Sequence, residues 1–284
     1  MNDPGPGLNK TPFQKAMNAF GYAAGRFGKP LPSLDPGELT RKAEKKAGLS
    51  AAGIPLPEGL SRLVEGMEKD GRLPATGRMA ARNELVHLLA NRIAVRDHIG
   101  KNPSCAREKI ERPIFVTGLP RSGAGLLHRL IMQDETNRPL LSWECRNPHP
   151  PITPLSFDSD QRIARFDREV KELYRRIPRY RSVRPIEAGD SADCSALLAM
   201  EFTSHDFFLF FNVPSYQSWL EMENAEEAYR AHRVLLQYLQ SSAYRGARWL
   251  LKSPSHMHNI SPLLKIYPRS EERRVGKECR SRRS

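Results

Sequence analysis

"ERPIFVTGLPRSGAGLLHRLI", residues 111–131, is the stretch that decides the fold. Its first half, PIFVTG, is a short apolar run of the kind that is buried on both faces of a parallel sheet. The chain then turns through LPRSG and enters AGLLHRLI, which is predicted to be a helix. A strand, a glycine-containing turn and a helix N-terminus form an anion site, because the first backbone N–H groups of a helix have no helical partner. The stretch therefore predicts a loop that holds a phosphate or sulfate.

The loop departs from the nucleotide-binding P-loop at its end. Gly118 and Gly123 have the P-loop spacing GxxxxG, but Ala124 and Gly125 follow where lysine and then serine or threonine are required. Without that lysine and hydroxyl, the outer phosphates and Mg²⁺ lose their ligands, which disfavours an ATPase or GTPase. Arg121 offers instead a planar, bidentate grip on a phosphate or sulfate without a metal. A turn that binds nothing is the alternative.

Helical patterns alternate with short apolar runs along the chain. The leucines at 85, 88 and 89 and the isoleucine at 93 form one apolar stripe on a helix. Further helices are predicted over 160–177, 226–244 and 257–267, and RWLLKSP, residues 248–254, contains a second strand. Helices that separate short buried strands predict an α/β fold with a parallel sheet. We expect a three-layer α/β/α domain at 111–268, after a loop-rich segment at 1–57 with one short helix and a helical region at 58–110.

The composition is that of a basic globular protein. The net charge of +13 favours anionic partners, such as nucleic acid, membrane surfaces or phosphorylated small molecules. Residues 269–284 alone hold seven basic and three acidic side chains, and the remainder does not demand a polyanion. No run approaches the roughly 18 apolar residues of a membrane span, and the N-terminus lacks a signal pattern. We therefore expect a cytoplasmic protein, with no nucleic-acid partner and no stable membrane insertion.

No metal site is expected from the cysteines and histidines. Cys105, Cys145, Cys194 and Cys279 form no CxxC pair and are interpreted as reduced thiols. His256 and His258 are two residues apart and do not share a helical face. HDFFLFF, residues 205–211, is expected as buried core, with the wall of an apolar acceptor site as the alternative.

The segment around the loop resembles a known family. RPIFVTGLPRSGAGLLHRL is similar to the 5′-phosphosulfate loop of the PAPS-dependent sulfotransferases, usually written PRSGTT. The similarity continues, in order, through SWE, DCSALL, VPSYQSWL and RWLLKSPSHMHNISPLLKIYP, over about residues 60–268. The bacterial sulfotransferases that act on small molecules look most similar. The resemblance implies transfer of a sulfuryl group from PAPS to a hydroxyl or amine of a small-molecule acceptor, without a metal.

The resemblance also implies site residues. Lys252 resembles a family lysine that contacts the bridging or sulfuryl oxygens, where a cation would neutralise the departing phosphate; a solvated lysine is the alternative. Glu144 resembles the general base that takes the acceptor's proton, and a structural carboxylate paired with an arginine such as Arg146 is the alternative. With Arg121 these are the implied catalytic residues. The implied donor-binding residues are Pro120, Arg121, Ser122, Gly123, Ala124, Gly125, Lys252 and Ser253.

The sequence departs from the family pattern at two places. Ala124 and Gly125 stand where the family has two hydroxyl residues, commonly Thr-Thr, so two side-chain hydrogen bonds to the phosphosulfate would be missing. After LLKIYP the family continues into a strand that ends in arginine, with a serine beyond, and these hold the 3′-phosphate. Here residues 269–284 contain no apolar strand and resemble the translated read-through of a sequencing or cloning adapter.

We therefore expect a C-terminally truncated sulfotransferase with a non-native tail at 269–284, a natural terminus being the alternative. A kinase-like P-loop enzyme, a basic protein that binds nucleic acid and a catalytically dead fragment are the competing interpretations.

Overall fold

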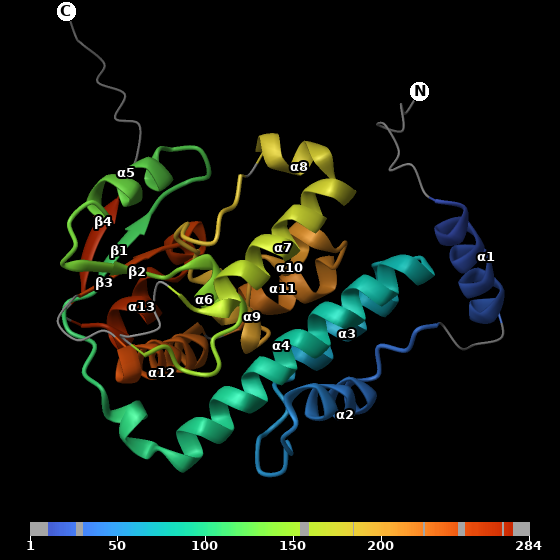
Figure 1. The fold of residues 1–284 in the computed structure, drawn as a ribbon, viewed down its shortest axis with the longest axis horizontal. Coiled ribbons are helices and arrows are strands. Elements are labelled where there is room, and N and C mark those ends of the chain that lie inside the picture. The colour runs from blue at the N-terminus through green and yellow to red at the C-terminus, as the bar shows by residue number, and fades with distance from the viewer. Residues whose placement is uncertain are drawn as a thin grey trace, which may run out of the picture.

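A small parallel sheet lies at one side of the molecule, and the long helix α4 crosses the other (Figure 1). The computed structural model describes residues 11–26, 31–153, 159–183, 185–223, 225–243, 248–268 and 270–274. Among these residues, no helix combines the length and the apolar composition needed to cross a membrane.

Helices dominate the described chain. In chain order they are α1 (Pro12–Arg26), α2 (Pro36–Ala47), α3 (Glu58–Lys69), α4 (Ala75–Lys101), α5 (Ala124–Ile131), α6 (Ser142–Arg146), α7 (Gln161–Arg176), α8 (Pro178–Val183), α9 (Ser195–Met200), α10 (Phe207–Phe210), α11 (Pro214–Met222), α12 (Ala225–Ala243) and α13 (Ile260–Ile266). The 3₁₀ helices are η1 (Pro103–Arg107) and η2 (Pro254–Asn259). The strands are β1 (Ile114–Thr117), β2 (Asn137–Pro139), β3 (Arg248–Lys252) and β4 (Glu271–Arg274).

The sheet has the strand order β2-β3-β1-β4, and neighbouring strands are parallel. Both strands expected from the sequence form, as the central pair β1 and β3. Their register places Val116 opposite Lys252, so the carboxyl ends of the two strands lie side by side. Loops that follow these ends meet at one edge of the sheet, where open α/β folds bind ligands.

Helices cover both faces of the sheet, which confirms the three-layer α/β expectation. On one face, Val116 and Leu250 pack against Leu127 of α5. On the other face, Phe115 and Leu251 join the main apolar core together with buried residues of α12 and α13. This alternation follows from the pleat, which points successive side chains to opposite faces.

The predicted apolar stripe of α4 is confirmed. Leu85, Leu88, Leu89 and Ile93 are all buried in the main core. On the same helix, Arg92 and Arg96 donate to the carboxylate of Glu201, at 2.8 and 2.6 Å, at the C-terminal end of α9. These ion pairs fix α9 against α4.

The N-terminal 57 residues are more helical than the sequence analysis expected. In place of one short helix within loops, α1 and α2 form. The Asp35 side chain caps α2 by accepting from the N–H of Glu38 at 2.8 Å, and Gly48 ends the helix in the left-handed conformation. Leu39 and Ala43 are buried against the core, so packing stabilises a helix with weak apolar content.

The segment predicted to contain no apolar strand contributes a strand nevertheless. The backbone of Glu271–Arg274 pairs in parallel with β1, with Ile114 opposite Glu271 and Thr117 opposite Arg274. Backbone hydrogen bonds to an open strand edge do not require apolar side chains, so the charged residues EERR form a strand although the segment holds no apolar one. Residues 269 and 275–284 of the predicted tail lie outside the described residues.

Candidate active site

The predicted anion loop connects β1 to α5. It turns at Ser122, whose N–H donates to the carbonyl of Leu119 at 3.1 Å. Arg121 has a φ of 64° and Gly123 a φ of 95°, so two nearby residues adopt the left-handed region. Glycine adopts the left-handed conformation without strain, whereas a residue with a Cβ is strained there by about 1–3 kcal/mol. Such strain is typical of ligand-binding loops.

The hydroxyl of Ser122 is the most informative atom of the loop. Its Oγ is buried and has no hydrogen-bond partner among the described residues. A buried polar atom in this state requires a partner that the described chain does not supply. The side chain of Arg121, next to Ser122, is exposed.

Lys252 ends β3 beside the carboxyl end of β1, at the same edge as the loop. Its Nζ lies 3.8 Å from Oδ1 of Asp193, and both side chains are partly exposed. The pKa of buried His128, on α5, is lowered to about 4, chiefly by burial and in part by the charge of Lys252. The ammonium group of Lys252 therefore lies close to α5 as well as to Asp193.

Ser253 fixes the end of β3 to the end of β1. Its N–H donates to the carbonyl of Val116 at 3.3 Å, and its carbonyl accepts from the Thr117 hydroxyl at 2.9 Å. Its own hydroxyl lies 2.8 Å from that of Ser255. The structure thus places Ser253 at the predicted edge, with its side chain engaged in its own turn.

Glu144 lies on α6 and is shielded from solvent. It is fully buried, and its Oε1 accepts from Nη2 of Arg138 at 2.6 Å. Burial raises the pKa of Glu144, while the charge of Arg138 opposes the shift. The guanidinium of Arg138 in turn stacks over the Trp249 ring, 4.1 Å from its centroid. The carboxylate is thus paired with an arginine, as the structural alternative expected, but with Arg138 and not Arg146.

Asp193 is the site residue that sequence reasoning missed. It lies just before α9, between two backbone hydrogen bonds: Ala192 donates to Leu140 at 2.8 Å, and Cys194 donates to Lys252 at 2.9 Å. The sequence block DCSALL contains Asp193 but does not single it out. Its distance of 3.8 Å from Nζ of Lys252 places it at the candidate site.

The comparison with known families agrees with this geometry. A family model described as the sulfotransferase family matches residues 113–271, from the start of β1 to the start of β4. The chain belongs to the sulfotransferase family. The match contains the anion loop, Glu144, Asp193 and Lys252.

Solved sulfotransferases share the fold. The crystal structure of sulfotransferase STF1 from Mycobacterium tuberculosis H37Rv has a TM-score of 0.70 and 25% identity, over 85% of this chain and 67% of that one. Sulfotransferase STF9 from Mycobacterium avium has a TM-score of 0.77 and 25% identity, over 87% and 63%. The chain thus spans about two thirds of the length of these enzymes. Among curated proteins no match was found.

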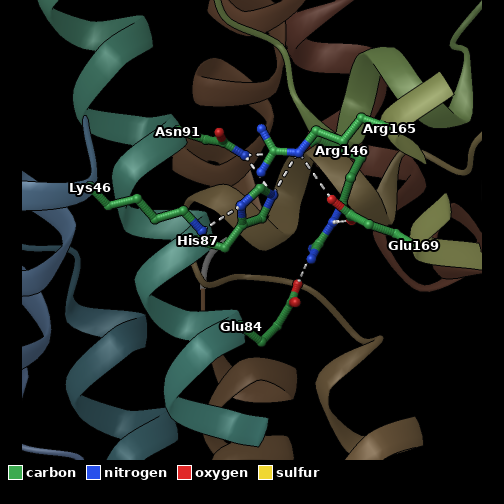
Figure 2. A network of polar contacts seen from close by, with 7 residues as sticks. All are labelled: Lys46, Glu84, His87, Asn91, Arg146, Arg165 and Glu169. Carbon is green, nitrogen blue, oxygen red and sulfur yellow. Dashed lines mark hydrogen bonds and ion pairs between the residues drawn. The ribbon is translucent and has the colours of Figure 1, made fainter. Parts of the chain in front are cut away.

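In this sulfotransferase, Arg146 anchors the short helix α6 that carries Glu144. Its Nη1 donates to Glu84 at 2.6 Å and its Nε to Glu169 at 3.1 Å, while its carbonyl accepts from Asn91 at 2.9 Å and lies 2.8 Å from Nε2 of His87. Figure 2 shows these side chains converging from α2, α4, α6 and α7. The residues drawn there are Lys46, Glu84, His87, Asn91, Arg146, Arg165 and Glu169.

The aromatic segment of the sulfotransferase divides into two parts. Phe207 is buried core, as expected, and Phe208 and Phe211 pack against the core, but Leu209 and Phe210 are 67% and 61% exposed, which corrects the expectation for these two residues. They line a cavity of about 370 Å³ with Phe208. Tertiary packing decides this division, because α10 turns only one side of its four residues inwards.

Two contacts connect this aromatic segment to the strand edge. Ser195, next to the residue that bonds to the Lys252 carbonyl, donates to Asp206 at 2.8 Å. His205 stacks on His258 of η2, with ring centroids 6.3 Å apart. His256 points into the core and lies 2.8 Å from the hydroxyl of Tyr229.

Proposed function

We propose that this sulfotransferase moves the sulfuryl group of PAPS to a hydroxyl or amine of a small-molecule acceptor, in the cytoplasm. The single observation that carries the proposal is the buried, unpartnered hydroxyl of Ser122 in a strained loop at the start of α5. Family membership favours this reaction over a kinase-like one. The absence of the P-loop lysine from the sequence favours it as well.

The loop residues would hold the 5′-phosphosulfate of the donor. Arg121 supplies a bidentate guanidinium, Ser122 its free hydroxyl, and residues 123–125 the N–H groups at the start of α5. Pro120 shapes the turn before them. Ala124 and Gly125 supply no side-chain hydroxyl, so donor binding relies on the backbone and on Arg121.

Lys252 would stabilise the charge that develops during transfer. The donor supplies an activated sulfuryl group, whose bond to the phosphate breaks as the acceptor oxygen bonds to sulfur. Lys252 is placed at the loop's edge of the sheet, where its ammonium neutralises the departing phosphate. Ser253 supports Lys252 by fixing the end of β3 to β1. The sequence resemblance suggests Glu144 as the proton acceptor, but its full burial and its pairing with Arg138 disfavour that role.

We further propose an acceptor with an apolar body. The exposed Leu209 and Phe210 line an open hollow of about 370 Å³, and the contacts of His205 and Asp206 connect α10 to the Lys252 edge. An aromatic or aliphatic alcohol would lay part of its carbon skeleton against these two side chains. Phe210→Ser should raise the KM for such an acceptor and leave the KM for PAPS unchanged. An equal rise in both values would contradict this assignment.

Calorimetric titration with PAP, the desulfated product of PAPS, tests the donor site directly. We expect binding without Mg²⁺, weakened by Arg121→Ala and unchanged by Arg129→Ala, which removes an exposed arginine from the outside of α5. Radiolabelled PAPS then reports transfer to a panel of alcohols and amines. Mg²⁺-dependent ATP binding would favour the kinase-like alternative, and PAP binding without any transfer would favour a catalytically dead protein.

A further inference from the structure

Two carboxylates near the strand edge differ in their access to an acceptor. A general base must come within about 2.6–3.2 Å of the hydroxyl that it deprotonates. The side chain of Glu144 is 1% exposed, and one of its oxygens is bound to the buried Arg138. The side chain of Asp193 is 23% exposed, similar to the 21% of Lys252 beside it. Only Asp193 can meet an acceptor without a rearrangement of the core.

The backbone on both sides of Asp193 is fixed. Ala192 donates to the carbonyl of Leu140, and Cys194 donates to the carbonyl of Lys252. A backbone held in this way limits the positions open to the Asp193 side chain, and catalytic groups need such support. Burial raises the pKa of the buried Cys145 thiol most, Glu144 and Cys194 raise it further, and Asp193 adds the smallest contribution. The two carboxylates therefore belong to one neighbourhood, one below the surface and one at it.

The distance to Lys252 places Asp193 close to the position where the acceptor hydroxyl would release its proton. In the proposed function, Lys252 contacts the oxygens around the bond that breaks. The acceptor oxygen that attacks the sulfur must then lie within a few ångströms of Lys252. The Oδ1 of Asp193 is 3.8 Å from Nζ of Lys252, within reach of a hydroxyl in that position.

We infer that Asp193 is the catalytic residue that takes the acceptor's proton, a role that rests on the proposed function. The acceptor O–H bond breaks, its proton passes to the Asp193 carboxylate, and its electron pair forms the O–S bond. The S–O bond to the phosphate breaks, and that electron pair leaves on PAP beside Lys252. Asp193 then releases the proton to water. Glu144 serves in this scheme as the counter-charge of Arg138.

The decisive experiment compares two acceptors of different acidity with the 284-residue chain. 4-Nitrophenol ionises readily and needs little help from a base, whereas unsubstituted phenol must be deprotonated during the reaction. We expect Asp193→Asn to lower kcat with phenol by about 100-fold or more, and with 4-nitrophenol by less than about tenfold. Its affinity for PAP should stay within about twofold of the wild type, because a base does not hold the donor. Asp193→Glu should recover part of the phenol activity.

Asp190→Asn is the matched control, because it removes a carboxylate three positions earlier that bonds to the N–H of Glu187 in its own loop. Melting temperatures and PAP binding identify any variant that fails to fold. An equal loss with both phenols, an unchanged kcat in Asp193→Asn, or the acidity-dependent loss in Glu144→Gln instead would overturn the assignment of Asp193. A wild-type protein that binds no PAP, or that transfers to neither phenol, would overturn the assignment together with the proposed function.

Discussion

The guanidinium of Arg138 lies 2.6 Å from a carboxylate oxygen of Glu144, and neither side chain is more than 5% exposed. The pair joins β2 to α6 inside the protein, and the ring of Trp249 covers the guanidinium. Two charges removed from water in this way stabilise little by themselves, but each compensates the burial of the other. Removal of one partner therefore leaves the other charge buried without compensation.

Arg138→Met should be strongly destabilising. It leaves the Glu144 carboxylate buried without its counter-charge, and breaking a buried pair from one side costs about 3–5 kcal/mol. The free energy of unfolding, measured by urea denaturation, checks this value. In the double variant Arg138→Met/Glu144→Gln the loss should be smaller, because no uncompensated charge remains. A double variant less stable than Arg138→Met would contradict the pairing.

The loss in Arg138→Met should also depend on pH. Burial raises the folded-state pKa of Glu144 above its ordinary 4.5, and Arg138 limits the rise. A group with a raised pKa contributes stability below its unfolded pKa and loses it as the pH rises through the folded value. Without Arg138 the folded pKa rises further, so the variant should be closer to wild type at about pH 5 than at about pH 8. The same urea curves at the two pH values test the sign.

Arg121→Gly should separate stability from donor binding. The left-handed backbone at Arg121 costs about 1–3 kcal/mol, and glycine relieves it against an entropic cost of about 0.5–1 kcal/mol. Unfolding free energy should therefore be unchanged or rise by up to about 1 kcal/mol. PAP affinity should fall about 10- to 150-fold, the equivalent of one charge-assisted contact of about 1.5–3 kcal/mol.

Arg72→Gly is the control for this experiment. Arg72 also has a positive φ, of 42°, but it lies between α3 and α4 and outside the loop. It should show a similar change in stability with no change in PAP binding. Weaker PAP binding in Arg72→Gly would show that affinity follows general loop changes and not the guanidinium of Arg121.

The parts of the fold that the sequence could predict are those with a local signal. A few neighbouring residues are enough to predict three features: the apolar run of β1, the glycine turn after it and the apolar stripe of α4. β2 has no such signal, because its residues Asn137–Pro139 include a proline and an arginine whose burial depends on Glu144. α2 did carry one, Asp35 before Pro36 with Gly48 beyond its end, and a closer reading of these caps would have predicted it.

The candidate site shows the same division. Arg121 and Ser122 lie in the loop after β1, and Lys252 ends β3, so the parallel sheet brings them to one edge. Asp193 follows no strand, and its place depends on backbone bonds to Leu140 and Lys252 that exist only in the folded chain. The accessibility of Glu144 could not be predicted for the same reason, since the partner that buries it comes from β2.

His87 should lower the free energy of unfolding of the protein in acid. Burial, together with the charges of Arg146 and Lys46, lowers its pKa from 6.5 to about 3. Below about pH 6.5, His87 therefore binds a proton in the unfolded chain but not in the folded chain. The free energy of unfolding then falls as the pH drops towards 3. His87→Gln should reduce the slope of unfolding free energy against pH by about 1.4 kcal/mol per unit between these values. An unchanged slope in a folded His87→Gln variant would refute the assignment.

The missing hydroxyls of the loop offer a gain-of-function test. A Cβ added at Gly125 meets no atom within 4 Å, so the double variant Ala124→Thr/Gly125→Thr has room for the second side chain. If the phosphosulfate lies at the start of α5, each new hydroxyl that reaches it should add about 1.5–3 kcal/mol, and PAP should bind at least about tenfold more tightly. Gly100→Thr, at the end of α4, is the control, because it also meets no atom within 4 Å but lies on another helix. Tighter PAP binding in the loop variant alone, measured by calorimetry, would locate the donor at this helix start. Unchanged affinity in a folded double variant would place the phosphate elsewhere.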